Sequence, residues 1–246
     1  MIEIAYFCSM SFRFKQFFVE DGRTAMKVGT DGVLLGAWGG IPSNGRLLDV
    51  GCGSGLIALM SAQRSSENVI VDAVEIDKGA VNDAKDNFDV SPWRNRLNIY
   101  CDDFRTFATS SSIKYEAILS NPPYFCNSLL PEKSGRIIAR HTASLGYDEL
   151  FCCVARLLSP TGKFSMITPA DCYNDVSRIA LDNSLYLTRS TYVISRAGCR
   201  PKRILSEWGG VASDCIMGKL EIEKSPGIYS DEYISLVKDF YIKPFL

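Results

Sequence analysis

The sequence predicts an α/β protein with a mostly parallel sheet, helices on both faces and an antiparallel hairpin at one edge. From residue 46 onward, short apolar runs alternate with helical patterns, and this alternation is typical of a parallel sheet covered on both faces. Near the end, the strand-like runs 186–194 and 202–210 follow each other without a clear helix between them. Successive strands of this kind pair as an antiparallel hairpin. A chain of 246 residues can hold this fold in a single domain.

The first half of the chain supplies four of the expected strands and two helices. The segment "LIALMSAQR" (56–64) is apolar on most faces and predicts a buried helix. In "DKGAVNDAKDNF" (77–88), the apolar residues recur at helical spacing. The strands expected around these helices are 46–50, 69–76, 96–101 and 115–120.

The second half continues the alternation. The segment "GYDELFCCVARLLSPTG" predicts a helix that begins after Asp148 as N-cap and stops at Pro160 and Gly162. A strand at 163–169, a helix at 173–183 and the two hairpin strands follow. Behind Ser230, the residues Tyr233, Leu236, Val237 and Phe240 form an i, i+3, i+4, i+7 stripe. The chain is therefore expected to close with an amphipathic helix.

The composition favours a large buried core. Apolar residues make up 46% of the chain and charged residues 22%, and no apolar run is long enough to span a membrane. Glu3 and the lack of a basic stretch before the first apolar residues argue against a secretory signal. We therefore expect a cytoplasmic protein with no membrane partner. The oligomeric state is left open, with a monomer as the working expectation.

A glycine-rich loop, "DVGCGSG", lies between the first strand and the first helix, with Asp49 followed by Gly51, Gly53 and Gly55. Alternate glycines let the backbone turn tightly and bring N–H groups close to a ligand at a helix N-terminus. The loop also fits the G-x-G-x-x-A form of a dinucleotide site, and a purely structural turn is a further alternative. A carboxylate at Asp49 favours S-adenosylmethionine, because this cofactor carries cationic groups where a dinucleotide carries an anionic pyrophosphate.

Two acidic positions after the next strands complete this site. Glu75 stands 20 residues beyond Gly55 at a strand end, where it could accept hydrogen bonds from ribose hydroxyls of either cofactor. Asp103 could accept a hydrogen bond from the adenine amino group while Phe104 covers the ring. The alternative for Asp103, or for its neighbour Asp102, is the N-cap of the next helix.

The stretch "ILSNPPYF" (118–125) places N-P-P-Y at the end of the fourth strand, where open α/β sheets bind ligands. Pro122 and Pro123 fix two φ angles and remove two donors, so the Asn121 side chain and the Pro122 carbonyl become outward-facing acceptors. Two acceptors holding an aromatic amine, with its ring stacked on Tyr124, could aim the nitrogen lone pair at an electrophilic methyl group. A rigid structural turn is the alternative.

Other chemistries find less support. The single histidine, His141, would have to serve any Ser-His-Asp or Cys-His mechanism, and the nine cysteines form no C-x-x-C or Cys/His cluster. We therefore expect no metal site. The net charge of −1 excludes a strongly basic coat, but two basic segments, 133–141 and 196–203, could neutralise phosphates. Their candidate RNA-binding residues are Arg136, Arg140, Arg196, Arg200, Lys202 and Arg203.

Together these residues resemble class I S-adenosylmethionine-dependent methyltransferases that modify planar nitrogens. The stretches "FRFKQFFVEDGRTAMKVGTDGVLLGAW" (12–38), "SNPPYF", "ARHT" and "PKRILSEW" look like the tRNA1(Val) adenine-N6 methyltransferase family, which modifies the adenine at tRNA position 37. N-P-P-Y is shared with methylases of DNA adenine, rRNA guanine and release-factor glutamine. The stretch K-V-G-T-D-G (27–32) is more specific.

The resemblance implies a seven-stranded Rossmann-like methyltransferase fold and a division of the chain. Residues 1–40 would be an N-terminal extension that covers the cofactor site, 45–210 the core sheet and 211–246 a C-terminal decoration. It also implies that Asp49 and the three glycines hold the methionine part of the cofactor, and that Glu75 holds its ribose. Segment 27–31, with Lys27, Thr30 and Asp31, would close over the site. Asn121, Pro122, Pro123 and Tyr124 would be catalytic.

The sequence therefore predicts methyl transfer from S-adenosylmethionine to the N6 amine of an adenine in tRNA. An unstacked anticodon-loop base is easier to extrude into such a site than a base in a duplex. One alternative is a methyltransferase for another planar amine, such as guanine N2 in rRNA, adenine in DNA or a protein glutamine. The others are an NAD(P)-dependent oxidoreductase and an RNA-binding module without catalysis.

Overall fold

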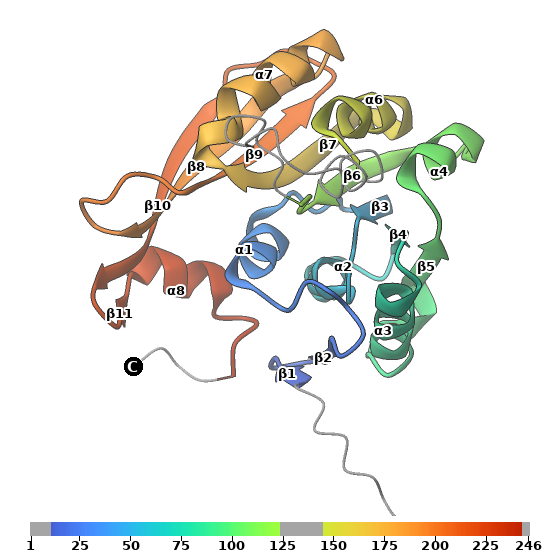
Figure 1. Cartoon of the computed structure of the whole chain (residues 1–246), viewed down its shortest axis with the longest axis horizontal. Helices are drawn as coiled ribbons and strands as arrows, with labels where there is room; N and C mark the ends of the chain where they lie inside the picture. The colour runs from blue at the N-terminus through green and yellow to red at the C-terminus, as the bar shows by residue number, and fades with distance from the viewer. Residues whose placement is uncertain (1–10, 124–144, 243–246) are drawn as a thin grey trace, which may run out of the picture.

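The structure, a computed structural model, describes residues 11–123 and 145–242. Its centre is a nine-stranded sheet with the order β11-β10-β8-β9-β7-β6-β3-β4-β5 (Figure 1). The five strands at one side run parallel to one another: β3 (Gly45–Val50), β4 (Val69–Glu75), β5 (Leu97–Cys101), β6 (Tyr115–Ser120) and β7 (Leu158–Pro169). This part of the sheet confirms the predicted α/β alternation.

The other side of the sheet is mixed. β9 (Arg203–Gly209) runs antiparallel between β7 and β8 (Tyr186–Arg196), so the antiparallel hairpin is present. It does not form the edge, because β10 (Ile216–Ser225) pairs in parallel with β8 and β11 (Ile228–Tyr229) pairs with β10. The expected seven strands are thus corrected to nine. β10 was not predicted from the sequence. Its second half does alternate, with Leu220 and Ile222 separated by a glutamate, but its first residues, Ile216 and Met217, are both exposed.

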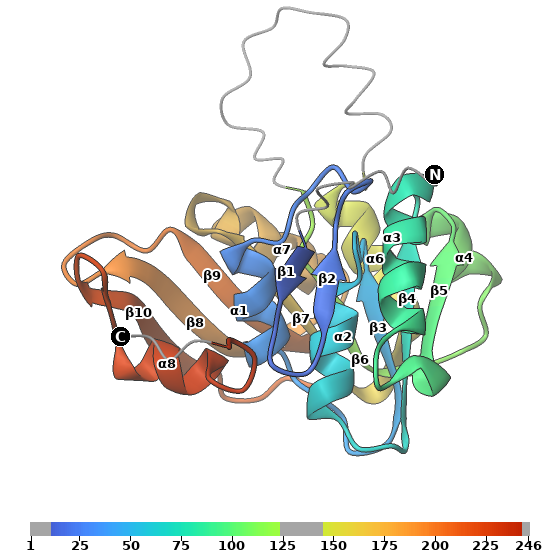
Figure 2. The ribbon, with the colours of Figure 1, turned by 90° about the horizontal axis from the view of Figure 1, so that it is seen from below.

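Helices cover both faces of the sheet, as the alternation predicted (Figures 1 and 2). One apolar cluster contains side chains of four helices: α1 (Thr30–Trp38), α2 (Leu56–Arg64), α3 (Lys78–Asp89) and α8 (Asp231–Val237). The other contains side chains of three: α4 (Phe104–Ser110), α6 (Tyr147–Leu157) and α7 (Tyr173–Asp182). Neighbouring residues of one strand, such as Leu47 and Leu48 of β3, belong to opposite clusters, because side chains alternate across a sheet.

The starts of α8 and α6 are fixed by hydrogen bonds. Ser230 is the N-cap of α8, and its hydroxyl accepts the Tyr233 N–H at 3.0 Å, so a helix does follow Ser230 as expected. For α6 the N-cap is Gly146 rather than Asp148. The Glu149 carboxylate accepts the Gly146 N–H at 3.1 Å, so the acidic side chain three residues on fixes this helix end.

Ahead of α1, the chain forms a small hairpin of β1 (Ser11–Arg13) and β2 (Phe18–Glu20). Figure 2 shows this hairpin on the face of the sheet that α1, α2 and α3 cover. The segment between β2 and α1 then passes along the glycine loop. Gly53 lies so near to it that a Cβ there would come 3.5 Å from Thr24 Cγ2.

Candidate active site

A cavity of about 690 Å³ lies at the carboxyl ends of β3, β4, β5 and β6. This edge is where open α/β sheets bind ligands, and the volume suits a nucleotide-sized molecule. The lining comes from segments that are far apart in the sequence: residues 24–32, 50–54, 74–77, 102–105 and 120–123. The structure therefore brings the glycine loop, both acidic strand ends and the N-P-P turn around one space.

The glycine loop has the backbone that its sequence predicted. Gly51, Gly53 and Gly55 have φ angles of +67°, +55° and +83°, a region that side chains with a Cβ rarely adopt. The Gly51 N–H donates to the Val74 carbonyl at 2.9 Å, which joins the loop to the end of β4. At Gly55 a Cβ would also come within 2.5 Å of a ring carbon of Phe88.

Glu75 stands at the mouth of the cavity and fixes the loop. Its carboxylate accepts three backbone N–H groups, from Gly53 at 3.0 Å, Ile76 at 2.8 Å and Asp77 at 2.9 Å. A carboxylate has about four acceptor sites, so one site is left for a further donor. The half-buried Glu75 is therefore placed to accept a hydrogen bond from a ligand hydroxyl while it holds the loop.

Asp49 lies beneath the loop and outside the cavity lining. It is fully buried, and its Oδ2 accepts the Ala58 N–H in the first turn of α2 at 3.0 Å. Its Oδ1 has no hydrogen-bond partner within the ranges that the structure describes. Burial raises the pKa of Asp49 from 3.8 to about 7, with the nearby Glu75 charge adding to the shift. The carboxyl group of Asp49 is thus buried behind the glycine loop, and only one of its two oxygens has a hydrogen-bond partner among the described residues.

Asp103 serves as the N-cap of α4, the alternative that the sequence left open. Its Oδ1 accepts the Arg105 N–H at 2.8 Å, and the Arg105 guanidinium also donates to it. The side-chain hydrogen bond from Arg105 lowers the pKa of Asp103. Both Asp102 and Asp103 line the cavity, together with the buried Phe104.

The N-P-P turn is held rigidly where it leaves the sheet. The Ser120 hydroxyl donates to the Val50 carbonyl at 3.0 Å, which ties the end of β6 to the end of β3. Asn121, Pro122 and Pro123 then line the cavity. Tyr124 lies outside the described residues.

The N-terminal segment contributes a wall of the cavity, and two of its polar side chains also have partners within the protein. The Lys27 ammonium donates to the Asp21 carbonyl and lies 3.6 Å from the Asp21 carboxylate. Asp31 forms an ion pair with Arg203 at 2.8 Å. Lys27, Thr30 and Asp31 all line the cavity, but two of these side chains bind protein groups there.

The basic segment 196–203 runs from the last residue of β8 through the turn 197–202 to the first residue of β9. Arg196 pairs with Glu223 at 3.3 Å, while Arg200 and Lys202 are exposed. The turn is fixed near the end of β7, where the Ala170 N–H donates to the Lys202 carbonyl at 3.1 Å. Through the Arg203 ion pair with Asp31 it reaches the cavity wall. Arg136 and Arg140 lie outside the described residues.

Sequence reasoning missed two apolar side chains at the cavity. Met26 and Ile76 line it while leaving 53% and 59% of their surfaces exposed. An apolar residue in a loop carries no periodic signal, so only the position of Ile76 directly after Glu75 could have suggested it. Exposed apolar groups beside a cavity suit a planar ring.

Within residues 11–123 and 145–242, no group of His, Cys, Asp and Glu side chains could hold a metal ion. None of the helices described there is long and apolar enough to cross a membrane.

Comparison with known proteins gives consistent results. Residues 33–168 match the methyltransferase small domain family. The tRNA1(Val) (adenine(37)-N6)-methyltransferase of Bacteroides fragilis is 47% identical over 94% of this chain and 98% of its own length. The protein of the same name from Yersinia enterocolitica is 41% identical over 94% of this chain and 92% of its own.

Solved structures agree on the fold. A predicted O-methyltransferase from Agrobacterium tumefaciens aligns with a TM-score of 0.65 at 15% identity, covering 85% of this chain and 96% of that one. A SAM-dependent methyltransferase from the same organism aligns with a TM-score of 0.58 at 15% identity, covering 82% and 70%.

Proposed function

The chain belongs to the family of tRNA1(Val) (adenine(37)-N6)-methyltransferases, and from this membership we propose that it methylates the N6 amine of adenine 37 in that tRNA. The methyl donor is S-adenosyl-L-methionine. The observation that carries the proposal is a match along nearly the whole chain. The matching family region, 33–168, also contains the glycine loop and the N-P-P turn.

The cavity fits this cofactor in size and in donor set. A Cβ built at Gly51 meets no atom within 4 Å, so the loop presents open backbone to the cavity. Glu75 is the proposed partner of the ribose hydroxyls, and Asp103 that of the adenine amine, with Asp102 as the alternative. Asp49 would act from behind the loop, since a buried carboxylate favours a cationic ligand nearby. When bound, S-adenosylmethionine supplies an electrophilic methyl group on a cationic sulfur.

The N-P-P turn is proposed to prepare the adenine amine for transfer. The Asn121 side-chain oxygen and the Pro122 carbonyl would accept the two amine hydrogens, which draws the nitrogen lone pair out of conjugation and orients it. The Ser120 hydrogen bond to Val50 supports this geometry, because it fixes the strand end that carries the turn. Tyr124 would stack on the target ring. The proton can leave to solvent after transfer, so the proposal needs no histidine.

The tRNA is proposed to approach over the turn between β8 and β9. Arg200 and Lys202 are exposed there, and the turn lies at the same edge of the sheet as the cavity. Lysine and arginine side chains contribute to RNA affinity through phosphate contacts. Arg196 and Arg203 would contribute less than these two, because each is paired with an acid. A monomer acting in the cytoplasm completes the proposal.

Replacement of Asn121 by alanine tests the proposed role of the N-P-P turn in methyl transfer. The variant Asn121→Ala is expected to bind S-adenosylhomocysteine as the wild type does, while methyl transfer to tRNA falls at least a hundredfold. Calorimetry and incorporation of labelled methyl groups measure the two quantities. Unchanged turnover would remove Asn121 from the mechanism.

A further inference from the structure

The cavity wall that precedes α1 is held by α3 rather than by the sheet. We propose that Asp83 and Asn87 of α3 are positioning residues for S-adenosylmethionine, which clasp residues 20–28 against the glycine loop and thereby set the affinity for the cofactor. We call residues 20–28 the N-terminal wall. The inference rests on the cofactor assignment above and adds two residues that do not line the cavity themselves.

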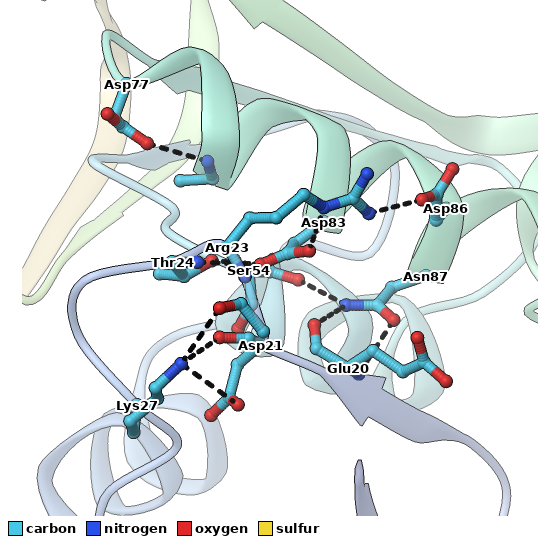
Figure 3. A network of polar contacts seen from close by, with 12 residues as sticks. Glu20, Asp21, Arg23, Thr24, Lys27, Ser54, Asp77, Asp83, Asp86 and Asn87 are labelled. Carbon is cyan, nitrogen blue, oxygen red and sulfur yellow. Dashed lines mark hydrogen bonds and ion pairs between the residues drawn. The ribbon is translucent and has the colours of Figure 1, made fainter. Parts of the chain in front are cut away.

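Asn87 connects the wall to the loop with one side chain. It is 1% exposed, and its Oδ1 accepts the Glu20 N–H at 2.9 Å. Its Nδ2 donates to the Glu20 carbonyl at 2.8 Å and to the Ser54 carbonyl at 2.9 Å (Figure 3). Ser54 belongs to the glycine loop, so one amide fixes the distance between the wall and the loop.

Asp83 holds the next part of the wall. It is 2% exposed, and its Oδ2 accepts the Arg23 N–H, the Thr24 N–H and the Thr24 hydroxyl, each at 2.8 Å (Figure 3). The Arg23 guanidinium donates to Oδ1 at 2.6 Å. Burial alone would raise the pKa of Asp83, but these hydrogen bonds outweigh it and lower the pKa. Asp83 is therefore an ionised anchor at neutral pH.

Hydrogen bonds within the N-terminal wall also hold it in a compact shape. The Val28 N–H donates to the Asp21 carboxylate at 2.9 Å, and the Lys27 ammonium lies on the Asp21 carbonyl. These contacts shape residues 21–28 as a compact loop, but they do not attach it to the rest of the protein. That attachment comes from buried Asp83 and Asn87, and from the exposed Asp86, which accepts a hydrogen bond from the Arg23 guanidinium (Figure 3).

Close packing at Gly79 supports the same picture. A Cβ at Gly79, in the first turn of α3, would come 3.0 Å from the Arg23 carbonyl oxygen and 3.4 Å from Arg23 Cβ. The wall thus lies directly on the start of α3. Since residues 24–28 line the cavity, a wall that lifts from α3 removes one side of the cofactor site. Apparent affinity then falls in proportion to the fraction of molecules with the wall in place.

The variant Asn87→Asp tests the clasp, because it keeps the size and the acceptor but removes both donors. It is expected to raise the Kd for S-adenosylhomocysteine and the KM for S-adenosylmethionine at least tenfold, with kcat at saturating cofactor within twofold of wild type. Asn82→Asp is the matched control, since Asn82 is exposed on the same helix. This control variant is expected to change neither the Kd for S-adenosylhomocysteine nor the KM for S-adenosylmethionine.

A second variant separates positioning from folding. Gly79→Ala favours the helix yet pushes on the wall, so we expect a melting temperature at least equal to wild type and a Kd raised severalfold. A folded Asn87→Asp protein with wild-type affinity would overturn the proposal. If that variant does not fold, wild-type affinity in Gly79→Ala overturns it.

Trypsin gives a readout that does not depend on the cofactor. Cleavage after Arg23 and Lys27 is expected to be faster in native Asn87→Asp than in wild type, and equal rates would contradict the clasp. A wild-type protein that fails to bind S-adenosylhomocysteine would instead contradict the cofactor assignment.

Discussion

The buried carboxyl group of Asp49 makes the stability of the protein without cofactor depend on pH. The carboxyl has one backbone donor, from Ala58, and its other oxygen has no partner within the described residues. Because burial raises its pKa from 3.8 to about 7, the folded state keeps a proton that the unfolded state loses between these pH values. The contribution of Asp49 to stability is therefore full below about pH 4 and is lost as the pH rises through 7.

The size of this effect follows from the pKa difference. Each pH unit inside the window changes the free energy of unfolding by about 1.4 kcal/mol for one proton. From pH 5 to pH 7 the wild type should thus lose about 3 kcal/mol through this group. The variant Asp49→Asn keeps an acceptor for the Ala58 N–H but cannot titrate, so it should lack this component.

Urea unfolding of both proteins at pH 5.0 and pH 7.5, without cofactor, measures the effect. The stability of Asp49→Asn relative to wild type should rise by about 3 kcal/mol between the two conditions. Only the change with pH is used, since the substitution can alter stability at either pH for other reasons. A stability difference that is the same at both pH values would show that Asp49 does not keep its proton in the folded state.

Three further predictions follow from local geometry. Gly55→Ala should destabilise the protein by about 3 kcal/mol, because φ is +83° and the new Cβ would meet Phe88. Chemical denaturation measures the free energy of unfolding, and a loss below about 1 kcal/mol would contradict the prediction. Ser230→Ala removes the N-cap of α8 and should cost about 1 kcal/mol in the same assay, with cofactor affinity unchanged. Arg200→Ala and Lys202→Ala should each weaken tRNA binding and reduce the magnitude of the slope of log K against log salt by about one. Binding titrations at several salt concentrations measure the slope, and an unchanged slope would show that the tRNA does not contact this turn.

The parallel half of the sheet and the glycine loop were predictable because their signals are local. Apolar runs such as 115–120 end at polar residues, and the spacing of Gly51, Gly53 and Gly55 specifies a backbone that few other residues can adopt. The N-P-P turn carries the same kind of local information. Its position at the cavity follows from the rule that parallel strands open their carboxyl ends at one edge.

The remaining features depend on contacts between distant segments. β10 lies in the sheet because it pairs with β8. Only its second half carries a local strand signal, the alternation of Leu220 and Ile222 with glutamates. A carboxylate placed before glycines can face a ligand or a helix start, and in Asp49 the contact is with the start of α2. The partners of Lys27 and Asp31, at Asp21 and Arg203, could not be read from the sequence, and the contacts of both residues with the cofactor stay a prediction. The helical spacing of Asp83 and Asn87 from Ala84 places both on the buried face of α3. The sequence does not show which distant segment supplies their hydrogen-bond partners.

A methylation assay on a defined RNA tests the proposed function most directly. The purified protein is incubated with labelled S-adenosylmethionine and an unmodified tRNA1(Val) transcript, beside a transcript in which adenine 37 is replaced by guanine. We expect N6-methyladenosine at position 37 of the first transcript and no label in the second. Equal labelling of both transcripts would contradict the assignment to adenine 37. In a parallel assay on a cell extract, label only in protein or in ribosomal RNA would contradict the assignment to tRNA.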